Sequence, residues 1–161
     1  MKSFPLAMIL ALALGQAAGA EATHHGPLDL EGAWIRETLP SQPVAGGFLT
    51  ITNTGTEADV LLSVTTPAAG RVEVHEVAMV ADVMRMRPLE DGLPLPAGET
   101  VMLKPGGYHL MLFELVEPMI AGAEVEVTFV FAEAGEITLT VPVGTWDGEM
   151  VGHGHGDMHH D

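Results

Sequence analysis

Short runs of β-forming residues, separated by glycine and proline turns, follow one another through most of this chain. The runs cover residues 45–53, 59–65, 71–79, 83–87, 100–103, 108–115, 124–131 and 136–143. The last two alternate apolar and polar residues for most of their length, which is typical of strands with one buried face. No segment keeps a sustained helical period. Strands of this length and spacing predict an all-β fold, either an antiparallel sandwich or a Greek-key barrel.

The two ends of the chain differ from this β-rich middle. Residues 1–20 combine Lys2, an apolar run and small residues in an A-x-A pattern, which is typical of a cleavable signal peptide cut after Ala20 or Ala22. We expect residues 21–29 to form a mobile segment, 30–143 a single β domain, and 144–161 a flexible tail rich in His and Met. The apolar run is too short to span a bilayer, and no Cys follows it. The sequence therefore predicts an exported, periplasmic protein without stable membrane insertion.

Charge and cysteine content exclude several classes of function. The 22 acidic residues outnumber 6 basic ones, for a formal charge of −16, which argues against binding to nucleic acid. The chain has no Cys, so it cannot form disulfides, thiolate zinc sites, iron–sulfur clusters or blue-copper centres. No arrangement of Ser, His and Asp has a supporting motif, and we predict that the protein is not an enzyme.

The segment 71–90 predicts a hairpin that carries a His and two Met residues. With the turn centred on Val80 and Ala81, His75 lies opposite Met86, and the pairs Glu76–Arg85 and Arg71–Glu90 combine opposite charges. Met84 and Met86 then point to the same face, which His75 shares. His109 and Met111 are spaced i, i+2 and share one face of a later strand. A strand folded over the hairpin would bring two His and two Met together.

Such a set of side chains favours one kind of metal. Thioether sulfur is a soft, neutral ligand and imidazole is intermediate, so His75, Met86, His109 and Met111 favour Cu(I) over zinc, magnesium or calcium. Each residue taken alone is more often a core or surface residue than a ligand. Their combination in an exported chain that is rich in His and Met is what predicts a copper site.

Additional His and Met residues are candidates for auxiliary metal binding. Met84 shares the Met86 face and is a neighbour of the site or a core residue. The tail offers imidazoles and a thioether that can bind a second copper ion as Cu(II), or can be a solvated chain end: His153, His155, Met158, His159 and His160. Tyr108 and Phe113 are candidates to shield the ion.

Three stretches of the sequence resemble the periplasmic copper chaperone family PCuAC. They are residues 74–79 (VHEVAM), 83–88 (VMRMRP) and 103–112 (LKPGGYHLML). The family signature is a His, ten residues, a Met, about twenty-one residues, then His-x-Met. Here ten residues separate His75 from Met86 and twenty-two separate Met86 from His109, so the second spacing is one residue longer. Residues 33–36 and 43–50 extend the resemblance over nearly the whole predicted domain.

This resemblance implies a fold, a ligand set and a role. It implies a cupredoxin-like antiparallel Greek-key β-sandwich in which His75, Met86, His109 and Met111 bind Cu(I). It also implies a copper chaperone that delivers Cu(I) to the copper A centre of cytochrome c oxidase. The expected partner is the copper A subunit or another copper chaperone, and the protein is expected to be a monomer.

Two other functions remain open at the level of the sequence. The first is a periplasmic metal buffer, or a zinc or nickel carrier, that works through the His-rich tail. The second is a β-sandwich interaction module in which the His and Met residues are incidental.

Overall fold

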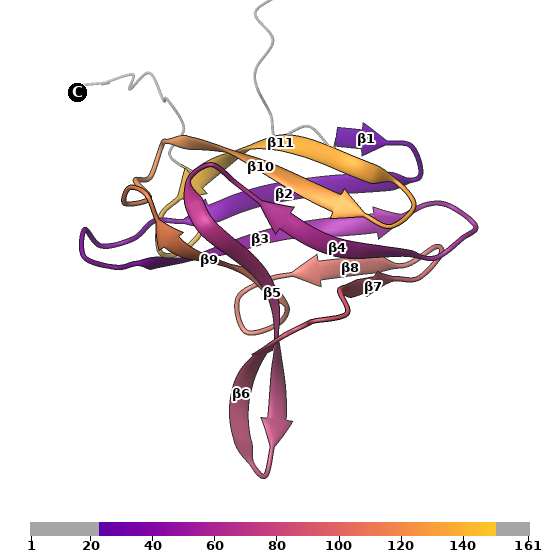
Figure 1. The fold of residues 1–161 in the computed structure, drawn as a ribbon, viewed down its shortest axis with the longest axis horizontal. Coiled ribbons are helices and arrows are strands. Elements are labelled where there is room, and N and C mark those ends of the chain that lie inside the picture. The colour runs from indigo at the N-terminus through magenta and orange to yellow at the C-terminus, as the bar shows by residue number, and fades with distance from the viewer. Residues whose placement is uncertain (1–22, 151–161) are drawn as a thin grey trace, which may run out of the picture.

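The computed structural model describes residues 23–150, and this part of the chain is built from strands without a helix (Figure 1). The eleven strands are β1 (Thr23–His25), β2 (Leu28–Arg36), β3 (Val44–Asn53), β4 (Asp59–Thr65), β5 (Ala69–Val80), β6 (Val83–Pro88), β7 (Leu93–Leu95), β8 (Thr100–Leu103), β9 (His109–Leu115), β10 (Glu124–Phe131) and β11 (Gly135–Gly144). The predicted all-β class is confirmed. Over the same residues, no helix is long and apolar enough to cross a membrane.

Seven of the strands close into a ring. Hydrogen-bonded neighbours run in the order β2, β11, β10, β4, β5, β9 and β3, and β3 pairs with β2 again. All these pairs are antiparallel except β2 and β11, which run parallel where Val143 lies beside Ile35. The predicted antiparallel β-sandwich is therefore corrected to a closed, mixed barrel, because β3 pairs with both β9 and β2 and because β11 runs parallel to β2. Strands β1, β6, β7 and β8 are added to the ring on β2, β5, β4 and β3.

The core fills the inside of this ring. In β10 the alternation predicted from the sequence is confirmed, since Val127, Phe129 and Phe131 are buried. Thr128 lies on the outer face, where its hydroxyl is hydrogen-bonded to that of Thr138. Because burying a large apolar side chain stabilises a fold by roughly 1.5–3 kcal/mol, these inward-facing residues hold together the frame on which the site is built.

Several boundaries differ from those predicted. Residues 23–29, expected to be a mobile segment, lie mostly in β1 and the start of β2, which pair antiparallel with each other. The region 92–98, expected to be a turn, contains β7, in which Leu93 and Leu95 are buried. Pro94 fits there because, among strands β1 to β11, β7 pairs with β4 on one side only, and an edge strand tolerates a residue without an N–H group. At the other end, Trp146 lies in the segment 144–161 that is expected to be a flexible tail. Its backbone N–H group donates a hydrogen bond to the carboxylate of Glu37.

The hairpin formed by β5 and β6 projects from the ring (Figure 1). The first part of β5, up to His75, pairs with β9, and its second part pairs with β6. The turn lies at Ala81 and Asp82, whose φ angles of 49° and 63° are those of a type I′ turn. The predicted register is therefore wrong by two residues: Pro88, not Met86, lies opposite His75.

The charge pairs change with the register. Glu76 forms its ion pair with Arg87 instead of Arg85. Arg71 forms a 2.8 Å ion pair with Glu73 instead of pairing with Glu90. A shift of two residues leaves every side chain on its original face, because side chains alternate with a period of two. Met86 therefore still shares a face with His75.

Candidate metal centre

Two histidines lie side by side where the hairpin leaves the ring. His75 in β5 and His109 in β9 are direct cross-strand partners, and their ring centroids are 5.7 Å apart. Both are buried, with relative exposures of 9 % and 6 %. Buried imidazoles need partners for their ring nitrogens, so the hydrogen bonds around them determine what each ring can bind.

The hydrogen bond of His109 leaves one nitrogen available. Its Nδ1 lies 2.9 Å from the carbonyl oxygen of Gly107, and a carbonyl only accepts, so Nδ1 carries the proton and donates it. In the neutral ring the lone pair is then on Nε2. Metal-binding histidines are typically held in this way, with the second ring nitrogen donating to a carbonyl or carboxylate.

His75 is held by a carboxylate on its own strand. Its Nε2 lies 2.8 Å from Oε2 of Glu73, which can only accept when it is ionised. The other nitrogen, Nδ1, is buried and has no hydrogen-bond partner among the described residues. A buried nitrogen with a free lone pair is costly unless something binds it, and a metal ion would satisfy it.

Glu73 remains ionised beside these rings. The hydrogen bond from His75 is the largest influence and lowers the pKa of the Glu73 carboxyl, opposed by burial and assisted by the charge of Arg71. The ion pair with Arg71 holds the carboxylate from its other side. The guanidinium of Arg71 in turn lies 4.4 Å from the ring centroid of Phe113.

Met111 lies next to the histidines on the same face. It is two residues from His109 along β9, and its cross-strand partners are Glu73 in β5 and Gly46 in β3. Gly46 has no side chain there, and an added Cβ would come within 3.2 Å of the Phe48 ring. A surface pocket of about 250 Å³ opens over this glycine and is lined by Met86, His109 and Met111 together with Arg36, Gln42, Val44, Ala45, Phe48, Pro105, Gly106 and Trp146.

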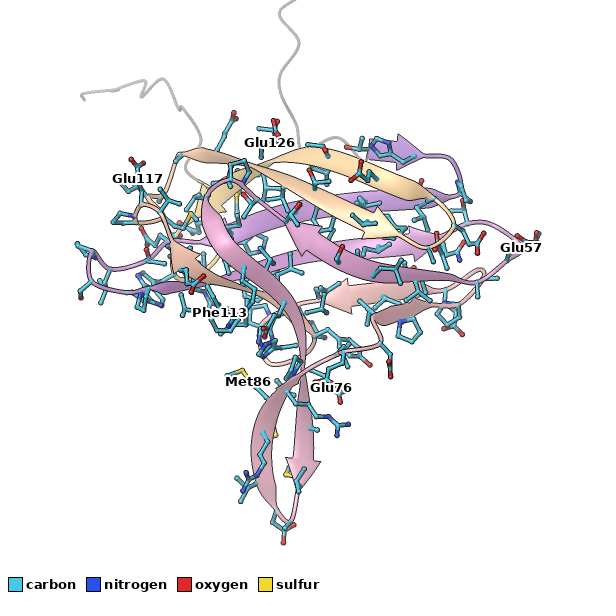
Figure 2. The ribbon with its side chains drawn as sticks, in the orientation of Figure 1. Glu57, Glu76, Met86, Phe113, Glu117 and Glu126 are labelled. Carbon is cyan, nitrogen blue, oxygen red and sulfur yellow. The ribbon has the colours of Figure 1, made fainter. Side chains whose placement is uncertain are left out.

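Met86 reaches the same pocket from the hairpin. Its cross-strand partner is Val77, so it lies diagonally from His75, and such diagonal neighbours are about 7–8 Å apart, a distance that long side chains bridge. The side chain is 59 % exposed, and Figure 2 shows its sulfur beside the base of the hairpin. Met86, His109 and Met111 thus line one pocket, and His75 lies beside His109. Met84 lies one step further toward the hairpin tip, opposite Met79, and is also exposed.

Several residues around the site were not identified as functional from the sequence. The guanidinium of Arg36 stacks 5.2 Å from the Phe48 ring centroid and 5.8 Å from that of Trp34. Phe48 and Trp146 line the pocket, and Trp34 packs against Phe48 with ring centroids 4.8 Å apart. They come from segments far from the His and Met residues in the chain, so no local spacing could have indicated them.

Of the two residues predicted to shield the ion, Phe113 lies beside the histidines and Tyr108 does not. The ring of Phe113 lies 6.0 Å from that of His75, as a shielding residue would. Tyr108 instead lines a separate surface hollow with Glu76, Arg87 and Pro88. The tail candidates His153, His155, Met158, His159 and His160, and the predicted signal peptide, lie outside the described residues.

The gathered donors define the chemistry of the site. The free nitrogens of two imidazoles and two thioether sulfurs are all neutral and range from intermediate to soft, which suits Cu(I). The carboxylate of Glu73 and the carbonyl of Gly107 orient the two rings by hydrogen bonds to the other ring nitrogens, as is typical of metal-binding histidines. The arrangement fits a soft metal ion, and the exposed Met86 leaves one side of it open to solvent.

Comparison with solved structures identifies the kind of domain to which this fold is similar. The chain is similar to the copper-bound PCuAC domain of PmoF2, at 26 % identity and a TM-score of 0.66, covering 78 % of this chain and 98 % of that one. It is also similar to Cu(I)-DR1885 of Deinococcus radiodurans, at 26 % identity and a TM-score of 0.58, covering 79 % and 83 % of the two chains. The predicted resemblance to PCuAC domains is thus confirmed.

Comparison of the sequence with known families shows the family to which the chain belongs. Residues 28–143 match the family described as "Putative lipoprotein LpqE-like", and the chain belongs to this LpqE-like family. It is 31 % identical over 116 residues to "Putative lipoprotein Lxx21020" of Leifsonia xyli subsp. xyli, a match that covers 72 % of this chain and 69 % of the relative. Membership of a family named for lipoproteins agrees with the predicted export.

Proposed function

We propose that this protein is a periplasmic copper chaperone that binds Cu(I) through His75, Met86, His109 and Met111. The observation that carries the proposal is the pair of adjacent imidazoles, in each of which one nitrogen is held by a hydrogen bond and the other has no hydrogen-bond partner among residues 23–150. The thioethers of Met111 and Met86 line one pocket with His109, which supports their inclusion in the ligand set. The copper-bound PCuAC domain and Cu(I)-DR1885, to which the chain is similar, support the same metal.

The ligand set suits a carrier better than a permanent metal cofactor. Neutral thioethers hold Cu(I) without the charge of a thiolate, so an incoming ligand can displace them. Met86 is 59 % exposed and stands on the projecting hairpin, whereas the histidines are buried. We propose that a partner displaces Met86 first and then withdraws the ion.

The partner proposed is the copper A centre of cytochrome c oxidase, or another copper chaperone. This part of the proposal is supported by the resemblance to the PCuAC family. It is tested by mixing the Cu(I)-loaded protein with an oxidase copper A domain. The loaded protein should metallate that domain faster than a free Cu(I) complex does, and an equal or slower rate would refute delivery.

Removing both thioethers should weaken copper binding strongly. Cu(I) is titrated into the full chain against a competing chelator, for the native protein and a Met86→Leu, Met111→Leu double variant. Leu conserves volume and removes sulfur, so we expect an affinity loss of roughly 100-fold with little change in folding. Met102→Leu is the matched control, because Met102 is an exposed methionine on β8.

The same titration separates the rival functions. An unchanged affinity in the double variant would refute the proposed site. A chain ending before Gly152 tests the tail: if only this deletion lowers the affinity, the protein is a His-tail metal buffer or carrier. Failure of every form to bind copper tightly would favour an interaction module.

Glu73 should tune the site without touching the ion. Glu73→Ala removes the carboxylate that orients His75, and loss of such a partner typically lowers metal affinity about 10–100-fold. Glu76→Ala is the control, because Glu76 lies on the same strand but on the opposite face, paired with Arg87. Equal affinities for the two variants in the chelator titration would show that Glu73 has no such role.

A further inference from the structure

The projecting hairpin carries three methionines on one face. Met79 and Met84 are direct cross-strand partners, which places their Cβ atoms about 5 Å apart. Met86 is two residues from Met84 on the same face and diagonal to Met79. Figure 2 shows further sulfur atoms along the hairpin beyond the labelled Met86. Three thioethers thus follow one another from near the hairpin tip to the base of the copper site.

These three side chains do not pack in the core. Met79, Met84 and Met86 are 65 %, 61 % and 59 % exposed, while Met119 is 4 % exposed in the core. Leaving large apolar side chains in water on a two-stranded extension gives up the stabilisation that their burial would contribute. A flexible thioether in this position is nevertheless well suited to bind a soft ion that approaches from solvent.

The charges of the hairpin lie on its other face. Glu76, Arg85 and Arg87 alternate with the methionines, so they point away from them. Besides the methionines, this face of the hairpin carries Val77, opposite Met86, and Pro88, opposite His75. Among the hairpin residues that point to this face, from Val77 to Pro88, none is a carboxylate, whereas three are thioethers that suit a soft monovalent ion.

We propose that Met79, Met84 and Met86 form a second, outer binding site for a soft monovalent ion such as Cu(I). Met86 belongs to both sites, because it also lines the pocket with His109 and Met111. An ion held by the outer thioethers passes inward when Met86 stays bound and the histidines and Met111 replace Met79 and Met84 as ligands, with no change of oxidation state. This inward transfer rests on the proposed function, but binding at the outer site does not.

The outer site is tested with Ag(I) alone, a soft monovalent probe that does not change oxidation state. Ag(I) is added to the full chain with ¹³C-labelled methionine methyl groups, whose signals are assigned with single Met→Leu variants. We expect the methyl signals of Met79 and Met84 to shift on binding. A Met79→Leu, Met84→Leu variant should lose about one bound equivalent relative to the native chain. Exposed substitutions of this kind leave stability nearly unchanged.

Two comparisons separate this site from the inner one. In a His109→Ala variant the Met79 and Met84 signals should still shift, because the outer ligands remain. Met102→Leu should bind as many ions as the native chain. The proposal is overturned if the Met79 and Met84 signals do not move in excess Ag(I), or if the double variant loses no bound ion. If the outer signals shift but the inner variants bind copper normally, the proposed function fails and the outer site stands.

The transfer step has its own readout. Uptake of Cu(I) by the inner site from a chelator complex should be several-fold slower in the Met79→Leu, Met84→Leu variant, at unchanged final affinity of the inner site. An unchanged uptake rate would refute the relay.

Discussion

Replacing His109 by alanine is expected to weaken Cu(I) binding by at least about 100-fold. The variant removes one of two adjacent imidazoles and leaves His75 to bind with thioethers alone. Since loss of a residue that merely orients a ligand costs about 10–100-fold in metal affinity, loss of the ligand itself should cost more. The measurement is a Cu(I) titration of the full chain against a competing chelator.

The matched control for His109 is His25→Ala. His25 lies in β1, which pairs with β2 and is remote from the hairpin in Figure 1. Its replacement should leave the affinity of the copper site unchanged. Because His109 is buried, the free energy of unfolding is measured for both variants. A folded His109→Ala protein with native affinity would exclude His109 as a ligand.

Replacing Phe129 by alanine is expected to lower the free energy of unfolding by about 3–5 kcal/mol. Phe129 is 1 % exposed and packs inside the strand ring, so its removal loses apolar burial and leaves a cavity. Denaturant unfolding measures the effect. The loss is a large part of the total stability of a domain of this size, which is typically about 5–15 kcal/mol.

Leu62→Ala provides the comparison for this prediction. Leu62 lies on β4, which pairs with β10, but its side chain is 53 % exposed. Substitutions at such positions usually change stability by less than about 0.5 kcal/mol. Similar unfolding energies for the two variants would contradict the inside-outside assignment of these strands.

The sequence predicts the strands of this fold better than it predicts their pairing. Alternation and turn residues place 59–65, 100–103 and 124–131 at the bounds that the structure has. Closure of the ring depends on β3 pairing with both β2 and β9, and on the parallel contact of β2 with β11. These contacts join distant segments, and no local pattern encodes them.

The hairpin register shows why charge pairs are weak guides. Arg85 and Arg87 both share a face with Glu76, so either could form an ion pair with its carboxylate. The position of the turn sets the register and so determines that Arg87 is the partner. The backbone adopts positive φ at Ala81 and Asp82, although type I′ turns prefer Asn and Gly. The face of each side chain was still correct, because the error was an even number of residues.

The site could be predicted only in part for the same reason. The sequence identified His75, Met86, His109 and Met111 as a candidate set, and the structure brings their strands together. The roles of Glu73 and Gly46 follow from the pairing of β5, β9 and β3, which spacing alone does not indicate. The aromatic wall around Arg36 arises in the same way from distant strands.

The most direct test of the proposed copper site is X-ray absorption at the copper edge. The full chain is loaded with a single equivalent of Cu(I), and the ligands are identified from the scattering of their atoms. The proposed site predicts Cu(I) with a mixed shell of sulfur and nitrogen, and loss of sulfur scattering in the Met86→Leu, Met111→Leu variant. A shell of nitrogen and oxygen alone, or an unchanged spectrum in that variant, would contradict it.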